Sequence, residues 1–256
     1  MRTIRMEEMT WPDVRAAIER GFTTVVIGVG STEQHGPHLP TMTDTRIGDE
    51  LAHRVALRLG HALQARTIPF GVSEHHLAFG GTISISPDTL RAILRDYVSS
   101  LACCGFKRIV LLPSHGGNFS TVQKVITEGC TTHPGVLVTG YADLLGFSGM
   151  SETTSARFGV SAEASGAHAG ENETAMMLAL EPALVQRDRF AAGYLGPLGE
   201  EQVQIIFARG MTALTANGVL GDPAGASPER GETYLELFAE FLAAKVENAP
   251  VDAGPA

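Results

Sequence analysis

The chain has 256 residues, of which 44% are hydrophobic and 18% are charged. The hydrophobic residues suffice for the core of one domain, so we expect a single domain over residues 1–256. About eight residues at its end are expected to form a disordered tail. Nineteen Lys and Arg residues against 28 Asp and Glu residues give a net charge of −9, which excludes nucleic acid as the expected partner. No apolar run reaches the roughly 18 residues of a membrane span and the N-terminus lacks the apolar core of a secretory signal, so we expect a cytoplasmic protein with no membrane partner.

Segments with the pattern of buried strands alternate along the chain with segments of helical period. Short apolar runs, the second pair weaker than the first, predict strands over 23–30, 108–114, 64–72 and 135–141. Helical spacing predicts helices over 44–60, 86–105, 120–130 and 227–247, with a further helix in ETAMMLAL. This alternation is typical of an α/β fold, in which a mostly parallel central sheet has helices on both faces.

The predicted helix over 86–105 carries clear signals at both ends. Ser86 is the expected N-cap, Pro87 occupies the first helical position, and Gly105 is the expected C-cap. Cys103 and Cys104 lie in its last, apolar turn, so we expect them to be small core residues. Three cysteines in all make a poor disulfide framework, which fits a reducing compartment.

Polar motifs follow the two strongest predicted strands. The strand over 23–30 leads directly into Ser-Thr-Glu-Gln-His-Gly-Pro-His, and the strand over 108–114 leads into Ser-His-Gly-Gly-Asn. In sheets of this type ligands bind beyond the carboxyl ends of the strands. The chemistry of this chain is therefore expected at that edge of the sheet.

Six of the nine histidines lie in short loop motifs beside glycines and carboxylates: His35, His38, His75, His76, His115 and His168. Glu33 and His35 point to the same side of an extended segment, because side chains alternate with a period of two. Imidazole nitrogen and carboxylate oxygen without thiolate suit Zn²⁺, Mn²⁺ or Fe²⁺, and an aspartate can bridge two such ions in a hydrolytic site. The sequence thus predicts a metal site.

Four motifs in this order, GSTEQHGPHLPTMTD, EHHLAFGGTIS, SHGGN and HAGENET, resemble the creatininase family of metal-dependent amidohydrolases. The resemblance covers roughly residues 20–240. It implies a three-layer α/β/α fold and two divalent metal ions per subunit, Zn²⁺ or Mn²⁺ and in some members Fe²⁺. It also implies hydrolysis of the C–N bond of a small amide, and a homohexamer built as a trimer of dimers.

The resemblance also assigns roles to residues. It makes Glu33, His35, Asp44 and His115 metal ligands, with Asp44 as the bridge. Creatinine-hydrolysing members have a further glutamate ligand two residues after the histidine, where this chain has Gly117. We expect Glu171 of HAGENET to replace it, as a ligand with a part in catalysis. The alternative is a site with four ligands or one that is weakly loaded.

His168 matches the histidine that passes a proton to the leaving nitrogen, a role for which His75 and His76 are alternatives. Substrate-binding positions are expected at His75, His76, Ser114, Gly116, Gly117 and Asn118. His38 and Glu173 are expected behind the ligands, and Glu173 either orients a ligand or caps the following helix.

The substrate is expected to be a small amide, a cyclic amide or a formamide. Creatinine-hydrolysing members enclose their substrate with tryptophans from the middle of the chain, whereas the only tryptophan here is Trp11. The Gly/Ser-rich segment 140–166 is expected to form a mobile loop over the site instead. Formylamino-pyrimidine deformylases and the peptidase of the mycofactocin precursor fit the motifs equally well. A non-catalytic protein that binds a metal or a metabolite is a further alternative.

Overall fold

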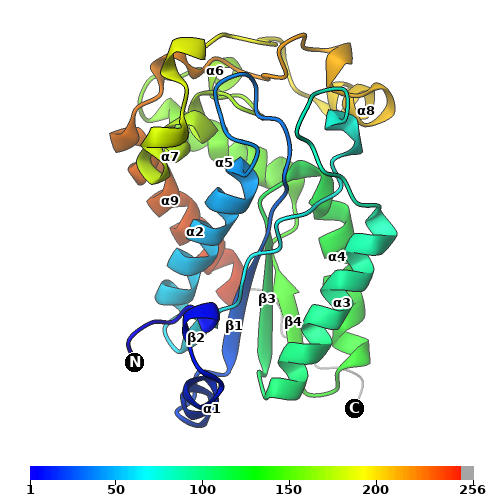
Figure 1. Ribbon diagram of the computed structural model, residues 1–256, viewed down its shortest axis with the longest axis vertical. Helices are drawn as coiled ribbons and strands as arrows, with labels where there is room; N and C mark the ends of the chain where they lie inside the picture. Colours follow the sequence, from blue (N-terminus) through cyan, green and yellow to red (C-terminus); the bar gives the residue numbers. More distant parts are fainter. Residues whose placement is uncertain (249–256) are drawn as a thin grey trace.

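Four parallel strands, in the order β2-β1-β3-β4, form the sheet at the centre of the described residues (Figure 1). The computed structural model describes residues 1–248, without the side chains of residues 130–132, so the expected C-terminal tail lies outside the described residues. The strands are β1 (Thr24–Val29), β2 (Ala62–Gln64), β3 (Arg108–Pro113) and β4 (Leu137–Gly140). Three of the four predicted strands are thereby confirmed. The fourth is shorter and earlier than 64–72, and most of that range is an extended connection.

The helices of the described chain are α1 (Trp11–Glu19), α2 (Thr43–Leu59), α3 (Pro87–Cys104), α4 (Phe119–Thr132), α5 (Leu144–Ala156), α6 (Ala162–Ser165), α7 (Glu171–Leu180), α8 (Glu200–Arg209) and α9 (Pro228–Glu247). The predicted caps of α3 are confirmed, because the Ser86 side chain accepts a hydrogen bond from the Thr89 amide and Gly105 has a φ of +107°. None of these helices combines the length and hydropathy needed to cross a bilayer.

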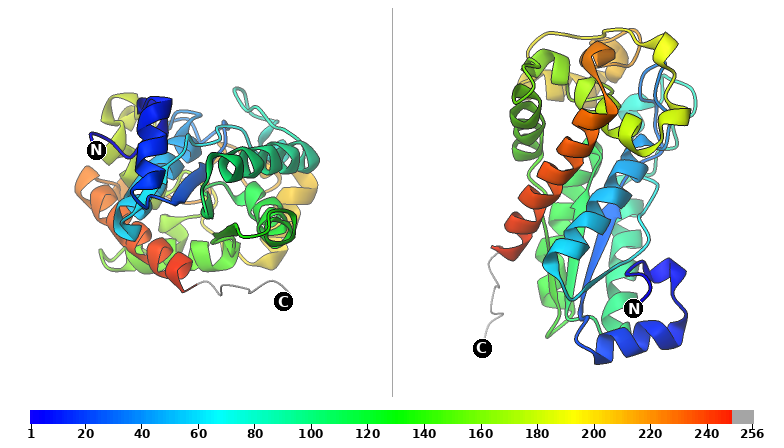
Figure 2. Two further views of the ribbon diagram at one scale, coloured as in Figure 1. Left: turned by 90° about the horizontal axis from the view of Figure 1, so that it is seen from below. Right: turned by 90° about the vertical axis from the view of Figure 1, so that its left-hand side faces the viewer.

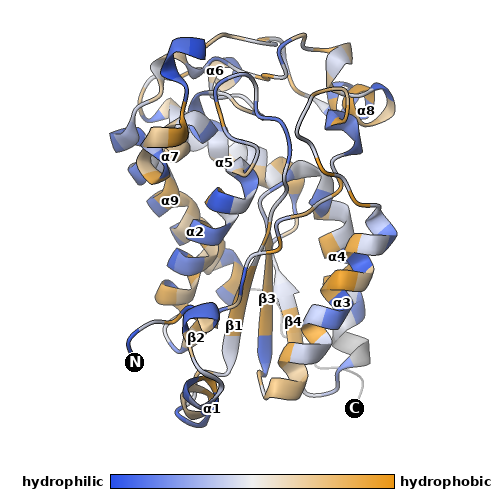
Figure 3. Ribbon diagram, viewed as in Figure 1, coloured by the Kyte–Doolittle hydropathy of each residue, from blue (hydrophilic) through white to orange (hydrophobic). Residues whose placement is uncertain are grey.

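The strands bury both faces, as their continuous apolar sequences require. Val26, Val110 and Leu112 pack into a core with residues of α2, α7 and α9. Val25 and Ile109 lie in a second core with residues of α3 and α4, on the opposite face. The strands accordingly form an apolar centre between two helical layers (Figure 3), and the view from below shows those layers on either side of the sheet (Figure 2). The predicted three-layer α/β/α fold is confirmed.

Two expectations about individual segments are wrong. Cys103 and Cys104 are exposed, because they lie in the last turn of α3, beyond Leu101, the last buried residue of the face that also contains Leu90, Leu94 and Val98. The segment 140–166 contains α5 and α6 rather than a single irregular loop. Its small, polar residues hide the helical period from which a helix is recognised in sequence.

The order of the strands determines where a ligand can bind. The chain leaves β1 towards β2 on one side of the sheet and leaves β3 towards β4 on the other side. These oppositely directed connections open a crevice at the carboxyl ends of β1 and β3, which are neighbours in the sheet. Both polar motifs begin in that crevice, at the upper end of the sheet in Figure 1.

Candidate metal centre

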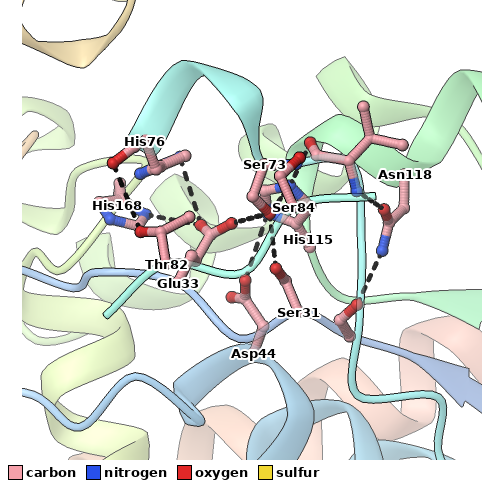
Figure 4. A network of polar contacts seen from close by, with 12 residues as sticks. Ser31, Glu33, Asp44, Ser73, His76, Thr82, Ser84, His115, Asn118 and His168 are labelled. Atoms are coloured by element: carbon pink, nitrogen blue, oxygen red, sulfur yellow. Dashed lines mark hydrogen bonds and ion pairs between the residues drawn. The ribbon is translucent and has the colours of Figure 1, made fainter. Parts of the chain in front are cut away.

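Four predicted ligands meet in the crevice, and Figure 4 shows three of them, Glu33, Asp44 and His115. Glu33 and His35 follow β1, Asp44 lies in the first turn of α2, and His115 follows β3; none is more than 4% exposed. His115 Nδ1 lies 3.0 Å from Glu33 Oε2 and 3.2 Å from Asp44 Oδ2. His35 Nε2 lies 3.2 Å from Asp44 Oδ1. Asp44 therefore stands between the two histidines, the position of a bridging carboxylate.

Carboxylate oxygens that lack a hydrogen-bond partner make this cluster suitable for binding cations. Glu33 Oε1 and Asp44 Oδ2 are buried without a hydrogen-bond partner among the described residues. A buried carboxylate oxygen is costly unless a donor or a cation compensates it. The ligand atoms of Glu33, His35 and Asp44 lie within 4.8 Å of one another, as do those of His35, His168 and Glu173. One ring nitrogen binds a single ion, so these two groups, which share His35, are alternative ligand sets for one cation.

Protons on His35 and His115 balance the negative charge of the carboxylates in the cluster. Burial would raise the pKa of Glu33, but the charges of His115 and His76 and the hydrogen bond with His115 together lower it to about 2. Burial opposes protonation of His35, yet the Asp44 carboxylate raises its pKa to about 10. The pKa of His115 is also well above the usual range, because Glu33 and Asp44 together favour the proton more strongly than burial disfavours it. Divalent ions would displace these protons, because a histidine binds metal only when neutral.

Main-chain carbonyl groups orient three imidazole rings. His115 Nε2 lies 2.9 Å from the Val72 carbonyl oxygen, and His35 Nδ1 lies 3.2 Å from the Glu33 carbonyl oxygen. His168 Nε2 lies 2.7 Å from the carbonyl oxygen of Gln34. In each case the nitrogen that donates to the carbonyl leaves the other ring nitrogen facing the carboxylates. This arrangement of a backbone acceptor behind the ring is typical of metal-binding histidines.

Glycine at position 117 allows close backbone packing that the glutamate of creatinine-hydrolysing members would prevent. A Cβ atom there would lie 2.7 Å from His115 Nε2 and nearer still to the Val72 carbonyl oxygen. A glutamate at this position would thus displace the carbonyl group that orients His115. The loop after β3 is built for glycine, so any fifth ligand would come from another part of the chain.

The structure does not bring Glu171 to the cluster, and this expectation is corrected. The Glu171 carboxylate accepts hydrogen bonds from the Tyr234 hydroxyl, at 3.0 and 3.1 Å, and from Arg230. Glu173 points towards the cluster instead, with Oε2 3.7 Å from His35 Nε2 and 2.6 Å from the amide nitrogen of Ala169. Ala169 has a φ of +54°, so this bond holds a left-handed turn. Burial, with the nearby negative charges, raises the pKa of Glu173 to about 7.

Other predicted site residues divide into those that face the cluster and those that support it. His76 Nε2 lies 3.3 Å from Glu33 Oε1, and the His75 ring packs at a tilt of 56° against Phe207, with 4.6 Å between centroids. Asn118 does not face a substrate, since its amide bonds the main chain of Val72, Val29 and Gly30.

Two further predicted residues lie close to the ligands. Ser114 donates to the carbonyl oxygen of Asp44 at 2.8 Å. His38 is buried and bonds Thr174 behind the ligands, as expected. Burial lowers the pKa of His38 to about 4, so the ring is neutral.

Sequence reasoning missed two residues. Ser73 donates to Glu33 Oε2 at 2.6 Å, and the Gln34 side-chain amide donates to His76 Nδ1 at 2.9 Å. Gln34 stands between two predicted ligands, so its place in the motif was a usable signal. The sequence offered no such signal for Ser73, because serines are common in loops.

A pocket opens above the cluster and ends on it. Glu33, His76, His115 and His168 form its floor, together with Gly116. Its walls are largely apolar and come from α5, α8 and the residues on either side of α8: Leu144, Leu145, Leu198, Val203, Ile206, Phe207 and Met211. Glu152 and Glu163 are the only charged wall residues in the described chain, and both are acidic. An anionic substrate therefore finds no basic partner there.

Comparison with known proteins gives a consistent result. The family model described as Creatininase, creatinine amidohydrolase, matches residues 7–246. A mycofactocin precursor peptide peptidase of Mycobacterium ulcerans is 34% identical over 242 residues, covering 91% of this chain and 82% of that protein. Creatinine amidohydrolase of Pseudomonas putida is 27% identical and covers 94% and 95%. A mutant creatininase of Zn–Zn type superposes with a TM-score of 0.79 at 26% identity, covering 98% of this chain and 100% of that one.

Proposed function

The chain belongs to the creatininase family of hydrolases, and on that premise we propose that it uses two divalent metal ions to hydrolyse an amide bond of a short peptide. The observation that carries the proposal is the buried set of ligands, two of whose carboxylate oxygens lack a hydrogen-bond partner, beneath an open pocket. The small non-peptide amide expected from the motifs becomes the second candidate. Relatives named as peptide peptidases share more identity with the chain than the creatinine amidohydrolase does.

The pocket itself favours a peptide over creatinine. Its walls offer apolar side chains from several elements, and Trp11 is exposed on α1, at the far end of the sheet (Figure 1). No tryptophan thus encloses the site within the described residues. An apolar wall suits the side chains of a peptide next to the bond that is cleaved.

Five residues would hold the ions: Glu33, His35, Asp44, His115 and Glu173. Their nitrogen and oxygen donors suit Zn²⁺ or Mn²⁺, and Fe²⁺ is compatible with the same set. When bound, such ions supply Lewis-acid chemistry, because they polarise a carbonyl group and lower the pKa of water. We infer that Glu173 takes the place that Gly117 leaves open.

His168 is suited to move the proton that the reaction requires. The bond from Nε2 to the Gln34 carbonyl oxygen leaves Nδ1 facing Glu33, at 3.7 Å from Oε1. Burial and then the charge of His35 hold the pKa of His168 well below the usual range, so the ring is neutral before reaction. A neutral Nδ1 can take a proton from the attacking water and deliver it to the leaving nitrogen.

Separate replacement of the two glutamates of α7, Glu171 and Glu173, by glutamine tests which of them is a metal ligand. We expect Glu173→Gln to weaken metal binding by at least about tenfold, because an amide is a poorer ligand and a poorer partner of the ligands than a carboxylate. Glu171→Gln should keep the wild-type metal content. Metal analysis of both proteins after dialysis against a weak chelator gives the comparison. The reverse pattern would restore Glu171 as the ligand.

A substrate panel tests the reaction. Short peptides with apolar residues, creatinine and formamides are incubated with the metal-loaded protein, and products are followed by mass spectrometry. We expect cleavage of peptides with a kcat/KM at least about a hundredfold above that of creatinine. Release of formate or creatine in preference would support a deformylase or a creatininase activity. Bound metal without any product would support the non-catalytic alternative.

Assembly and location complete the proposal. We propose a homohexamer, a trimer of dimers, from family membership, and light scattering of the purified protein measures its mass. A cytoplasmic location agrees with exposed, unpaired cysteines at Cys103 and Cys104.

A further inference from the structure

Glu171 is a fully buried carboxylate that the proposed chemistry does not use. It lies in the first turn of α7, and its oxygens bond Tyr234 and Arg230 of α9. The same carboxylate lies 3.4 Å from the hydroxyl of Ser155, at the end of α5. One side chain thus joins three helices that meet at the upper end of α9 (Figure 1).

Ser155 extends this network into the wall of the pocket. Its hydroxyl lies 2.9 Å from that of Ser165 in α6 and accepts a hydrogen bond from Asn172 of α7 at 3.1 Å. Asn172 also donates to Thr154 at 3.3 Å. The polar contacts of α5 and α6 with α7 therefore converge on the two residues that open α7, Glu171 and Asn172.

Few apolar side chains of α5 and α6 are buried against the core. The fully buried residues of this segment are Thr154, Ser155 and Ser165, all of which carry hydroxyl groups and belong to the network. Phe147 and Met150 are only partly buried against the core. An element held by polar contacts is positioned by the groups that satisfy them, because a buried hydroxyl without its partner is unfavourable.

This same segment forms one side of the substrate pocket. Leu144, Leu145, Ser148 and Glu152 of α5, and Glu163 of α6, line it opposite α8. We propose that Glu171 is a positioning residue, whose buried carboxylate fixes the α5–α6 wall against α7 and thereby sets the shape of the pocket that receives the substrate. The effect on substrate binding rests on the proposed hydrolase function, whereas the effect on the wall does not.

Two variants and one control test the proposal on the metal-loaded protein. Glu171→Gln weakens the whole junction, whereas Ser155→Ala removes the link from Glu171 to the wall together with the contacts of Ser155 with Ser165 and Asn172, and leaves the bonds of Glu171 to α9 intact. Glu232→Gln is the control, since it removes an exposed carboxylate of α9 that pairs with Arg54. Metal content, amide hydrogen exchange of residues 144–165 and kinetics on the best peptide of the panel are measured for each.

Both variants should keep the wild-type metal content and exchange faster in residues 144–165. KM should rise by roughly tenfold with kcat within about twofold, the pattern of lost binding that is equal in ground and transition states. Loss of metal in Glu171→Gln would overturn the proposal in favour of a ligand role. Unchanged exchange and KM, or an effect confined to Glu171→Gln, would also overturn it. If the wild-type protein cleaves nothing, the proposed function fails, and amide hydrogen exchange of residues 144–165 in Glu171→Gln still decides the role of Glu171.

Discussion

Asp44→Ala is expected to abolish hydrolysis and to bring the metal content of the purified protein towards zero. Asp44 stands between His35 and His115, at 3.2 Å from a nitrogen of each, so its two oxygens serve both halves of the cluster. Its position in the first turn of α2 favours the negative charge, because the amino end of a helix carries partial positive charge. Metal analysis and peptide cleavage on the same preparation measure both effects.

Folding has to be separated from metal binding in this experiment. Asp44→Asn keeps the size of the side chain and should show the same loss of metal with a smaller change in melting temperature. Asp88→Ala is a matched control, because Asp88 occupies the first turn of α3 and is exposed there. Retention of both ions in a folded Asp44→Ala protein would exclude Asp44 as the bridge.

His168→Ala is expected to leave the metal ions bound and to slow turnover by about 10²–10⁴, the usual contribution of a positioned acid or base. The loss should be largest for an unactivated peptide bond, whose nitrogen cannot leave without a proton. An activated anilide needs less help from an acid and should lose less. Comparison of kcat for the two substrates in wild type and variant measures this difference.

The control for this variant is another histidine far from the site. His61 stacks on Phe22 and is exposed, so His61→Ala should cleave at the wild-type rate. Unaltered turnover in His168→Ala would move the proton transfer to His75 or His76. Loss of metal in His168→Ala would instead make the imidazole a ligand.

The sequence located the candidate ligands that follow strands, and Asp44 at the start of α2, better than the candidate ligand in α7. Glu33, His35 and His115 come directly after buried strands, where the sheet fixes both position and direction. Glu171 and Glu173 are two residues apart in a helix, and about 100° of rotation per residue turns them to nearly opposite sides. The choice between them depends on the rotation of α7 about its axis, which packing against α9 determines.

Segment 140–166 escaped prediction for a related reason. The helices α5 and α6 bury hydroxyl groups instead of an apolar stripe, so no period appears in their hydrophobic residues. Gly117 is a second example of a feature that the sequence alone does not reveal. The motif indicated that a glutamate was missing, but the clash of any side chain with the Val72 carbonyl oxygen depends on a contact between distant loops.

The acceptors that orient the three imidazole rings are main-chain atoms of Glu33, Gln34 and Val72. Every amino acid supplies a carbonyl group, so a change of side chain at these positions leaves the acceptor in place. Mutation can therefore exchange one carboxylate ligand for another while the rings keep their orientation. A family built on such a frame can explore new metal ligands and substrates without first losing the geometry of its histidines.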